Sequence, residues 1–270
     1  MNPNKALWEK GDFTKVAAAM RESGEALVES LGVRDAMDIL DLGCGDGTTA
    51  VPAARRGANV LGVDIAENLV AAGNARAVAA GLNNLRFQEG DASNLQDLAD
   101  GSFDLVMSIF GAMFAPRPFQ VANEMVRVTR RGGRIVMGNW IPGDSTLIAQ
   151  LLKTSAAYSP PPPDGFISPV TWGVEDNVHE RFAAVGVPAD NIECERATYV
   201  FRIDAPPREL LETFKQYYGP TMNAFEAASK DGRADQLETE LARLFEQHNQ
   251  AGPDRTEIPA TFLKVTVTKP

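Results

Sequence analysis

The chain of 270 residues contains few of the residues that build metal centres or disulfide frameworks. It has two cysteines, Cys44 and Cys194, and two histidines, His179 and His248. Two cysteines are too few for a disulfide framework or a structural zinc site. We therefore expect no metal, and cysteine usage favours a reducing, cytoplasmic location. Neither histidine stands in a pattern that marks a catalytic base.

Long apolar runs and an excess of positive charge are also missing. No run of about 18 apolar residues is present, and no apolar segment follows the first five residues, so neither a membrane span nor a secretory signal is expected. Acidic residues number 36 against 26 lysines and arginines, which gives a net charge of -10. Because such a surface repels phosphate backbones, nucleic acid is not an expected partner. We expect a cytoplasmic monomer or homodimer.

The first half of the chain alternates short apolar runs with helical patterns. Strands are predicted at residues 37–42, 59–63, 84–88, 103–108 and 134–138. Helices are predicted at residues 13–31, 48–56, 66–80 and 119–128. Near-continuous apolar strands that alternate with helices are typical of a parallel sheet covered on both faces.

The second half has a different pattern. Residues 159–165 include four consecutive prolines and predict a surface loop. Residues 192–203 and 260–267 alternate like strands. Between them, helical patterns cover residues 207–218 and 222–247, the second with a break near Asp231. These segments add helices and two strands to the sheet.

A glycine-rich loop follows the first predicted strand. Gly43, Gly45 and Gly47 precede a predicted helix, where glycine lets a ligand approach the backbone and the helix start offers unpaired N–H groups. A dinucleotide fingerprint would need a third glycine at position 48, which is Thr48. The loop also lacks the Lys-Ser/Thr pair of a P-loop. It therefore predicts a cofactor site of another kind.

Acidic residues follow the next two predicted strands. Asp64 ends the second strand, at a distance from the glycine loop that suits a carboxylate binding a ribose diol. Asp91, between Gly90 and Ala92, ends the third strand and would meet the base end of the same nucleoside. Together they predict a cofactor that contains a nucleoside.

These motifs resemble, in order, those of the class I methyltransferases that use S-adenosylmethionine. Residues 41–47 resemble the first motif, 63–64 the acidic motif, 90–92 the adenine motif and 103–108 the fourth-strand motif. Residues 131–135 resemble the turn before the fifth strand, with Arg131 in place of the usual proline. The resemblance covers roughly residues 37–140. It is closest to the small-molecule branch that includes the quinone C-methyltransferases.

The resemblance implies a Rossmann-like, doubly wound α/β fold. Its sheet would be mostly parallel and seven-stranded, with an antiparallel last strand and an added helical cap. It further implies S-adenosylmethionine as cofactor and a small-molecule methyl acceptor. We expect one domain over residues 1–270 with a cofactor core at 37–140. The segments outside that core would form the substrate cover: residues 1–35, 141–185 and 206–250.

The resemblance also implies a role for each motif residue. Asp41 and the loop backbone would hold the methionine end, Asp64 the ribose, and Asp91 the adenine edge. Residues 108–110 would line the face where the methyl group leaves. The expected cofactor-binding residues are Asp41, Gly43, Cys44, Gly45, Gly47, Thr48, Asp64, Ile65, Asp91, Ala92, Ser108, Ile109 and Phe110.

Aromatic residues near the strand ends, beside the proline-rich loop and at the end of a predicted cap helix together predict an apolar acceptor pocket. The expected substrate-binding residues are Phe13, Met113, Phe114, Trp140, Trp172 and Tyr217. Trp8 and Phe13, which precede the first long helix, would close over the cofactor as a lid. No catalytic residue is assigned, because transfer from a sulfonium requires mainly alignment of the reacting groups.

Two other functions fit parts of the pattern. Asp64 would also suit a nicotinamide-dependent oxidoreductase, although Thr48 argues against that class. A non-catalytic protein that binds S-adenosylmethionine would share every motif, because transfer by alignment leaves no catalytic triad in the sequence. Turnover with a methyl acceptor separates this last alternative from an enzyme.

Overall fold

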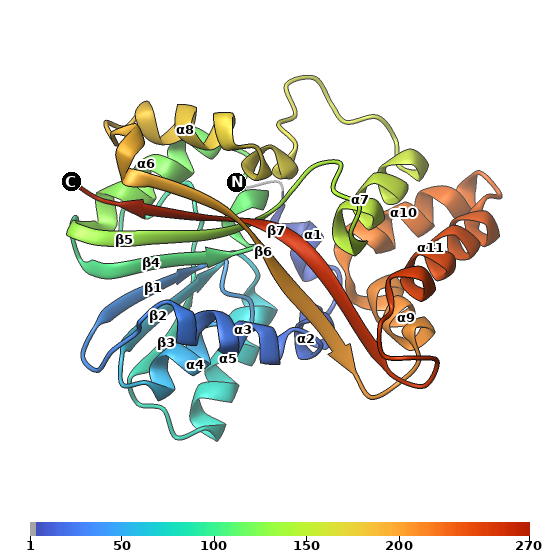
Figure 1. Ribbon diagram of the computed structural model, residues 1–270, viewed down its shortest axis with the longest axis horizontal. Coiled ribbons are helices and arrows are strands. Elements are labelled where there is room, and N and C mark those ends of the chain that lie inside the picture. Colours follow the sequence, from blue (N-terminus) through green and yellow to red (C-terminus); the bar gives the residue numbers. More distant parts are fainter. Residues whose placement is uncertain (1–3) are drawn as a thin grey trace.

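The computed structural model describes residues 4–270. They form a twisted seven-stranded sheet with helices packed around it (Figure 1). The strand order is β3-β2-β1-β4-β5-β7-β6. Strand β7 is antiparallel to both of its neighbours, and the other six strands are parallel to one another. The predicted α/β fold with an antiparallel last strand is confirmed. The strands are β1 (Asp38–Leu42), β2 (Asn59–Asp64), β3 (Leu85–Glu89), β4 (Phe103–Ile109), β5 (Thr129–Trp140), β6 (Ile192–Ile203) and β7 (Thr256–Thr268).

Helices cover both faces of this sheet (Figure 1). One face carries α3 (Arg21–Ser30), α4 (Ala50–Arg55) and α5 (Glu67–Ala79), and the other carries α6 (Pro118–Val128) and α8 (Glu175–Ala183). The central strands are apolar on both sides for this reason. Ile39 and Leu105 pack into the core beside α4, whereas Leu40 and Val106 pack into the core beside α6.

A separate group of helices forms a cap beside the sheet (Figure 1, right). It consists of α7 (Leu147–Tyr158), α9 (Pro207–Tyr217), α10 (Gly219–Lys230) and α11 (Ala234–His248). The short N-terminal helices α1 (Lys5–Glu9) and α2 (Phe13–Ala18) contact both this cap and α5. Three 3-10 turns complete the fold: η1 (Ala112–Phe114), η2 (Pro169–Gly173) and η3 (Ala189–Asn191).

The prediction of one helix over residues 13–31 is wrong. The chain breaks at Ala19 and Met20, whose N–H groups donate to carbonyls three residues back rather than four. The carbonyl of Ala19 accepts a hydrogen bond of 2.9 Å from the Arg202 N–H of β6. Since β6 lies far along the chain, the local pattern carried no sign of this break.

The other differences are three helices that were not predicted and the position at which β5 begins. Helices α1, α7 and α8 were not predicted, and β5 begins at Thr129 rather than at residue 134. Residues 130–133 bulge out of β5, because Thr129 pairs with Phe103 and Arg134 pairs with Leu105. The glycine turn seen in the sequence is therefore this bulge. Among residues 4–270, no helix combines the length and apolar character needed to cross a membrane.

Candidate functional site

The glycine loop lies at the carboxyl end of β1, where it leads into α4. Gly43, Gly45 and Gly47 have φ angles of 68°, 55° and 88°, in the left-handed region that favours glycine. The Gly43 N–H donates to the Val63 carbonyl at 2.7 Å, which fixes the loop to the end of β2. A Cβ atom on Gly43 would lie 2.6 Å from the Cα of Gly111. Backbone therefore meets backbone here, and neither position has room for a side chain.

Asp64 ends β2 and holds this loop from the other side. Its Oδ2 accepts the Gly45 N–H at 2.8 Å, and its Oδ1 accepts the Ala66 N–H at 3.0 Å. Burial raises the pKa of Asp64, and these backbone donors oppose the rise. Because each carboxylate oxygen has two acceptor positions, both oxygens keep capacity for a further donor on the side that faces the cavity.

Two more carboxylates are buried at the loop. Asp41 Oδ2 accepts the Thr49 hydroxyl at 2.6 Å, and burial raises the pKa of Asp41 to about 7. Asp46 bonds to the Arg21 guanidinium and lies 3.6 Å from that of Arg76. The other oxygen of each carboxylate, Oδ1, is buried without a hydrogen-bond partner in the described part of the chain. These orphaned acceptors favour a ligand that carries positive charge and N–H donors.

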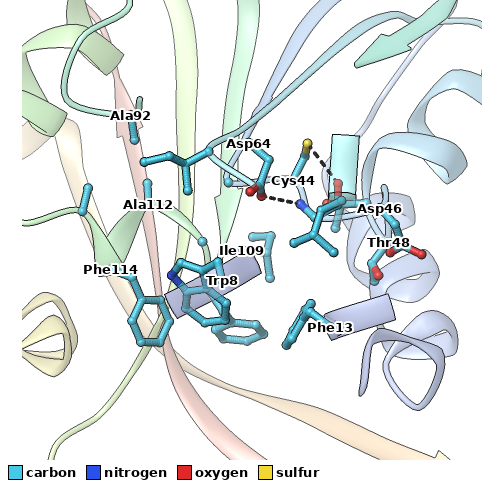
Figure 2. Close-up of a pocket in the computed structure, with 18 of the residues that line it drawn as sticks. Trp8, Phe13, Cys44, Asp46, Thr48, Asp64, Ala92, Ile109, Ala112 and Phe114 are labelled. Atoms are coloured by element: carbon cyan, nitrogen blue, oxygen red, sulfur yellow. Dashed lines mark hydrogen bonds between the residues drawn. The ribbon is translucent and has the colours of Figure 1, made fainter. Parts of the chain in front are cut away.

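A cavity opens in front of the loop (Figure 2). Its free volume is about 920 Å³ with the space open to solvent included. Figure 2 shows Asp64 and Cys44 on one wall and the rings of Trp8, Phe13 and Phe114 opposite them. One wall is thus polar and acidic, and the other is aromatic.

The cavity brings together most of the residues that the sequence indicated. Those that line it are Phe13, Gly43, Cys44, Gly45, Thr48, Asp64, Ile65, Ala92, Ile109, Phe110 and Phe114. Trp8, the second part of the predicted lid, lines it as well. Burial raises the pKa of the Cys44 thiol, so this cysteine remains protonated and packs as a small side chain.

Four predicted cofactor residues lie behind the cavity wall. Asp41 is covered by Thr49, which does line the cavity. Ser108 uses both functions of its hydroxyl inside the protein, since it donates to the Leu42 carbonyl and accepts the Ala112 N–H. The other two are Asp91, which bonds to the Ser93 N–H and hydroxyl, and Gly47, which packs on Phe87.

Four predicted acceptor residues also lie outside this cavity. Trp140 lines a smaller, adjoining cavity. The Arg181 guanidinium lies over the ring of Trp172, with its Cζ 4.4 Å from the ring centroid, and the same ring packs on Phe182 of α8. Met113 is buried in the main core, and Tyr217 lines neither cavity, although its neighbour Tyr218 lines the smaller one.

The sequence assigned no role to several of the residues that line the cavity. They are Asn4, Met20, Asp46, Thr49, Leu69, Gly90, Gly111, Ala112, Ala115 and Tyr199; of these, only Asp46 and Gly90 lie within the ranges of the motifs, and neither was assigned a role. Tyr199 is the clearest example, because it belongs to β6 and reaches the cavity through the pairing of β6 with β7. Its hydroxyl donates to the Met20 carbonyl at 3.1 Å.

Comparison with known proteins agrees with this geometry. Residues 40–137 match a family described as a methyltransferase domain. An uncharacterized protein of Mycobacterium tuberculosis is 34% identical over 247 residues, which cover 91% of this chain and 88% of that protein. The demethylmenaquinone methyltransferase of Beutenbergia cavernae is 37% identical over 115 residues, which cover 43% of this chain and 45% of that protein. The nocamycin O-methyltransferase of Saccharothrix syringae is 27% identical over 258 residues, which cover 90% of each chain.

This chain belongs to the class I S-adenosylmethionine-dependent methyltransferases. A solved phosphoethanolamine N-methyltransferase 2 of Haemonchus contortus, in complex with S-adenosyl-L-methionine, superposes on it with a TM-score of 0.61. The sequences are 17% identical, and the match covers 100% of this chain and 60% of that one. The methyltransferase described here shares that fold and uses S-adenosylmethionine as its cofactor.

The residues of the cavity fit this cofactor. The loop glycines leave backbone exposed for close approach, and Asp64 has free acceptor positions for a diol. The orphaned oxygen of Asp46, which lines the cavity, suits an ammonium group. The methyltransferase site therefore contains acceptors for the ribose diol and for the ammonium group of the cofactor.

Proposed function

We propose that this methyltransferase transfers the methyl group to a small organic molecule by direct in-line displacement. The observation that carries the proposal is the composition of the cavity, with cofactor acceptors on one wall and the aromatic rings of Trp8, Phe13 and Phe114 on the other. Two relatives are named for nocamycin and demethylmenaquinone, which supports an organic acceptor of modest size.

The main residues of the cavity have the following roles in the proposal. Asp64 binds the ribose hydroxyls, and Ile65 and Ala92 pack beside the adenine. The loop backbone and the orphaned oxygen of Asp46 hold the methionine end, and Asp41 supports that wall through its hydrogen bond with Thr49. Trp8 and Phe13 cover the cofactor and exclude water, and the segments that contain α2 and α9 contribute to the acceptor side.

When bound, the cofactor supplies a methyl group on a sulfonium, which is already a good leaving group. The protein therefore contributes mainly alignment, worth roughly 7–11 kcal/mol of barrier in favourable cases. Among residues 4–270, the titratable side chains that line the cavity are Cys44, Asp46, Asp64 and Tyr199. Burial raises the pKa of both Cys44 and Tyr199, so neither is an effective base near neutral pH.

The experiment that tests the proposal combines binding with turnover. Calorimetry with S-adenosylhomocysteine measures the cofactor site, and NADH serves as the competing ligand. Trideuteromethyl-labelled S-adenosylmethionine is then incubated with the protein and a protein-free metabolite extract. A labelled small molecule in the mass spectrum supports the proposal. If NADH binds and S-adenosylhomocysteine does not, the oxidoreductase alternative replaces it.

A further inference from the structure

An apolar chamber continues from the cofactor cavity toward the helical cap. The two spaces share the side chains of Trp8, Phe13, Met20, Phe110 and Phe114. The chamber has a free volume of about 330 Å³ with the space open to solvent included. Trp140, Phe201, Phe214 and Tyr218 extend its wall away from the cofactor.

The ring of Phe110 stands at the junction of the two spaces in a fixed orientation. It stacks on Trp140 with centroids 3.7 Å apart and planes only 7° from parallel. Its φ angle is 63°, in the left-handed region that a bulky residue seldom adopts. The Phe110 N–H donates to the Gly138 carbonyl at 2.9 Å, which helps to hold it there. Tyr199 and Phe262 pack edge-on against the same ring. The junction is therefore walled by aromatic rings held in place, against which a planar ring packs face to face or edge to face.

No charged side chain of residues 4–270 lines this chamber. Among the described residues, the hydrogen-bonding side-chain groups that line it are the Tyr218 hydroxyl and the indole N–H groups of Trp8 and Trp140. Burial raises the pKa of Tyr218, so the hydroxyl stays neutral. Because an unpaired charge is costly in such surroundings, a charged group is tolerated only at the junction, where the bound cofactor would supply the positive charge of its sulfonium.

We propose, on the basis of the methyl transfer proposed above, that the acceptor is a flat, apolar ring compound whose one charge is an enolate or phenolate held at the junction. The acceptor gives its proton to water before it binds, since the chamber has no base to receive it. The electron pair of the anion forms the bond to the methyl carbon, and the pair of the broken carbon–sulfur bond remains on sulfur. Both charges disappear, so the products are compatible with the apolar wall.

The charge requirement is tested with 4-hydroxycoumarin, a flat enol that is ionised at neutral pH. Its affinity is measured for the enzyme loaded with sinefungin, which places a cation near the sulfonium position and transfers no methyl group, and for the enzyme loaded with neutral S-adenosylhomocysteine. We expect at least about tenfold tighter binding to the sinefungin complex. Uncharged coumarin should bind both complexes equally. Equal binding of 4-hydroxycoumarin to both complexes overturns the proposal. So does binding of the flat cation 1-naphthylmethylamine to the sinefungin complex more tightly than 4-hydroxycoumarin.

The location of the site is tested with a matched pair of core variants. Phe214 lines the chamber, and Phe245 packs behind it at 5.6 Å between ring centroids without lining either space. Phe214→Leu should weaken 4-hydroxycoumarin binding about fivefold, whereas Phe245→Leu should leave it unchanged. Both variants should bind S-adenosylhomocysteine like the parent, which also shows that they are folded.

These measurements separate the two proposals. If S-adenosylhomocysteine fails to bind the parent protein, the proposed function fails. If it binds normally and 4-hydroxycoumarin binds no complex, or binds Phe214→Leu as tightly as the parent, only the assignment of the chamber fails.

Discussion

Replacing Asp64 by asparagine is the most direct perturbation of the cofactor site. Asp64→Asn preserves the shape of the side chain but turns one oxygen into an N–H₂ donor. In the structure both oxygens already accept backbone N–H groups, from Gly45 and from Ala66. Whichever way the amide is oriented, its nitrogen meets one of these donors. The substitution therefore removes one loop contact and the negative charge together.

The size of the effect follows from the bonds that Asp64 would make to the ribose. A hydrogen bond to a charged group contributes about 1.5–3 kcal/mol, and Asp64 is only 7% exposed, so solvent weakens it little. Losing one such bond raises the dissociation constant of the cofactor about 10–100-fold. The free protein should change less in stability. Burial raises the pKa of Asp64, so ionised Asp64 is itself costly at neutral pH, and its removal offsets part of the lost loop contact.

Calorimetric titration with S-adenosylhomocysteine measures the affinity, and thermal unfolding of the free protein measures the stability. Asp38→Asn is the matched control, because Asp38 begins β1 at the opposite edge of the sheet and pairs with Arg130. It should leave the affinity unchanged. An affinity of Asp64→Asn within twofold of the parent would refute the assignment of Asp64 to the ribose. An equal loss in both variants would show a general effect of charge instead.

Three further substitutions test the loop and its cover. Burial raises the pKa of Asp41 from its ordinary 3.8 to about 7, so within this window the folded protein retains a proton that the unfolded chain has released, and stability falls as pH rises. Asp41→Asn removes this dependence. As pH rises through the window, the free energy of unfolding of the variant, measured with urea, should therefore increase relative to that of the parent by up to about 1.4 kcal/mol per pH unit. Gly111→Ala places a Cβ 2.2 Å from the Gly43 carbonyl oxygen and should cost about 1–3 kcal/mol in the same assay, with weaker S-adenosylhomocysteine binding. Phe13→Ala should weaken that binding several-fold by removing roughly 1 kcal/mol of apolar contact, whereas Phe119→Ala, at an exposed position on α6, should not.

The parts of the site that the sequence predicted are those made by short stretches of chain. Gly43, Gly45 and Asp64 follow the ends of parallel strands, and the topology of such sheets brings those ends to one edge. The glycine positions could be inferred because the left-handed backbone that they adopt depends on the residue type at each position and not on distant segments. The positions of the parallel strands in the first half were predictable for the same reason, since each is a short, near-continuous apolar run.

The acceptor side could not be predicted in the same way, because it depends on packing between distant segments. Tyr199 and Phe214 reach the cavities only after β6 has paired with β7 and the cap has assembled. Trp172 shows the converse, since its position after the proline-rich loop pointed to the site but its ring is buried beside Arg181. An aromatic residue in a sequence carries no information on which of several apolar surfaces will take it.

The contacts of α1 and α2 connect the two halves of the site. Their ion pairs to the rest of the protein, Lys5 to Glu89 and Lys10 to Glu226, join partly exposed side chains and contribute little. Packing of Trp8 on Phe114, 4.9 Å between centroids, and on Tyr218, 5.9 Å, stabilises these helices more, because it removes apolar rings from water. The Trp8 and Phe114 rings line both the cofactor cavity and the chamber. A cofactor that orders them prepares the chamber for the acceptor, and by linkage the acceptor must strengthen cofactor binding by the same factor.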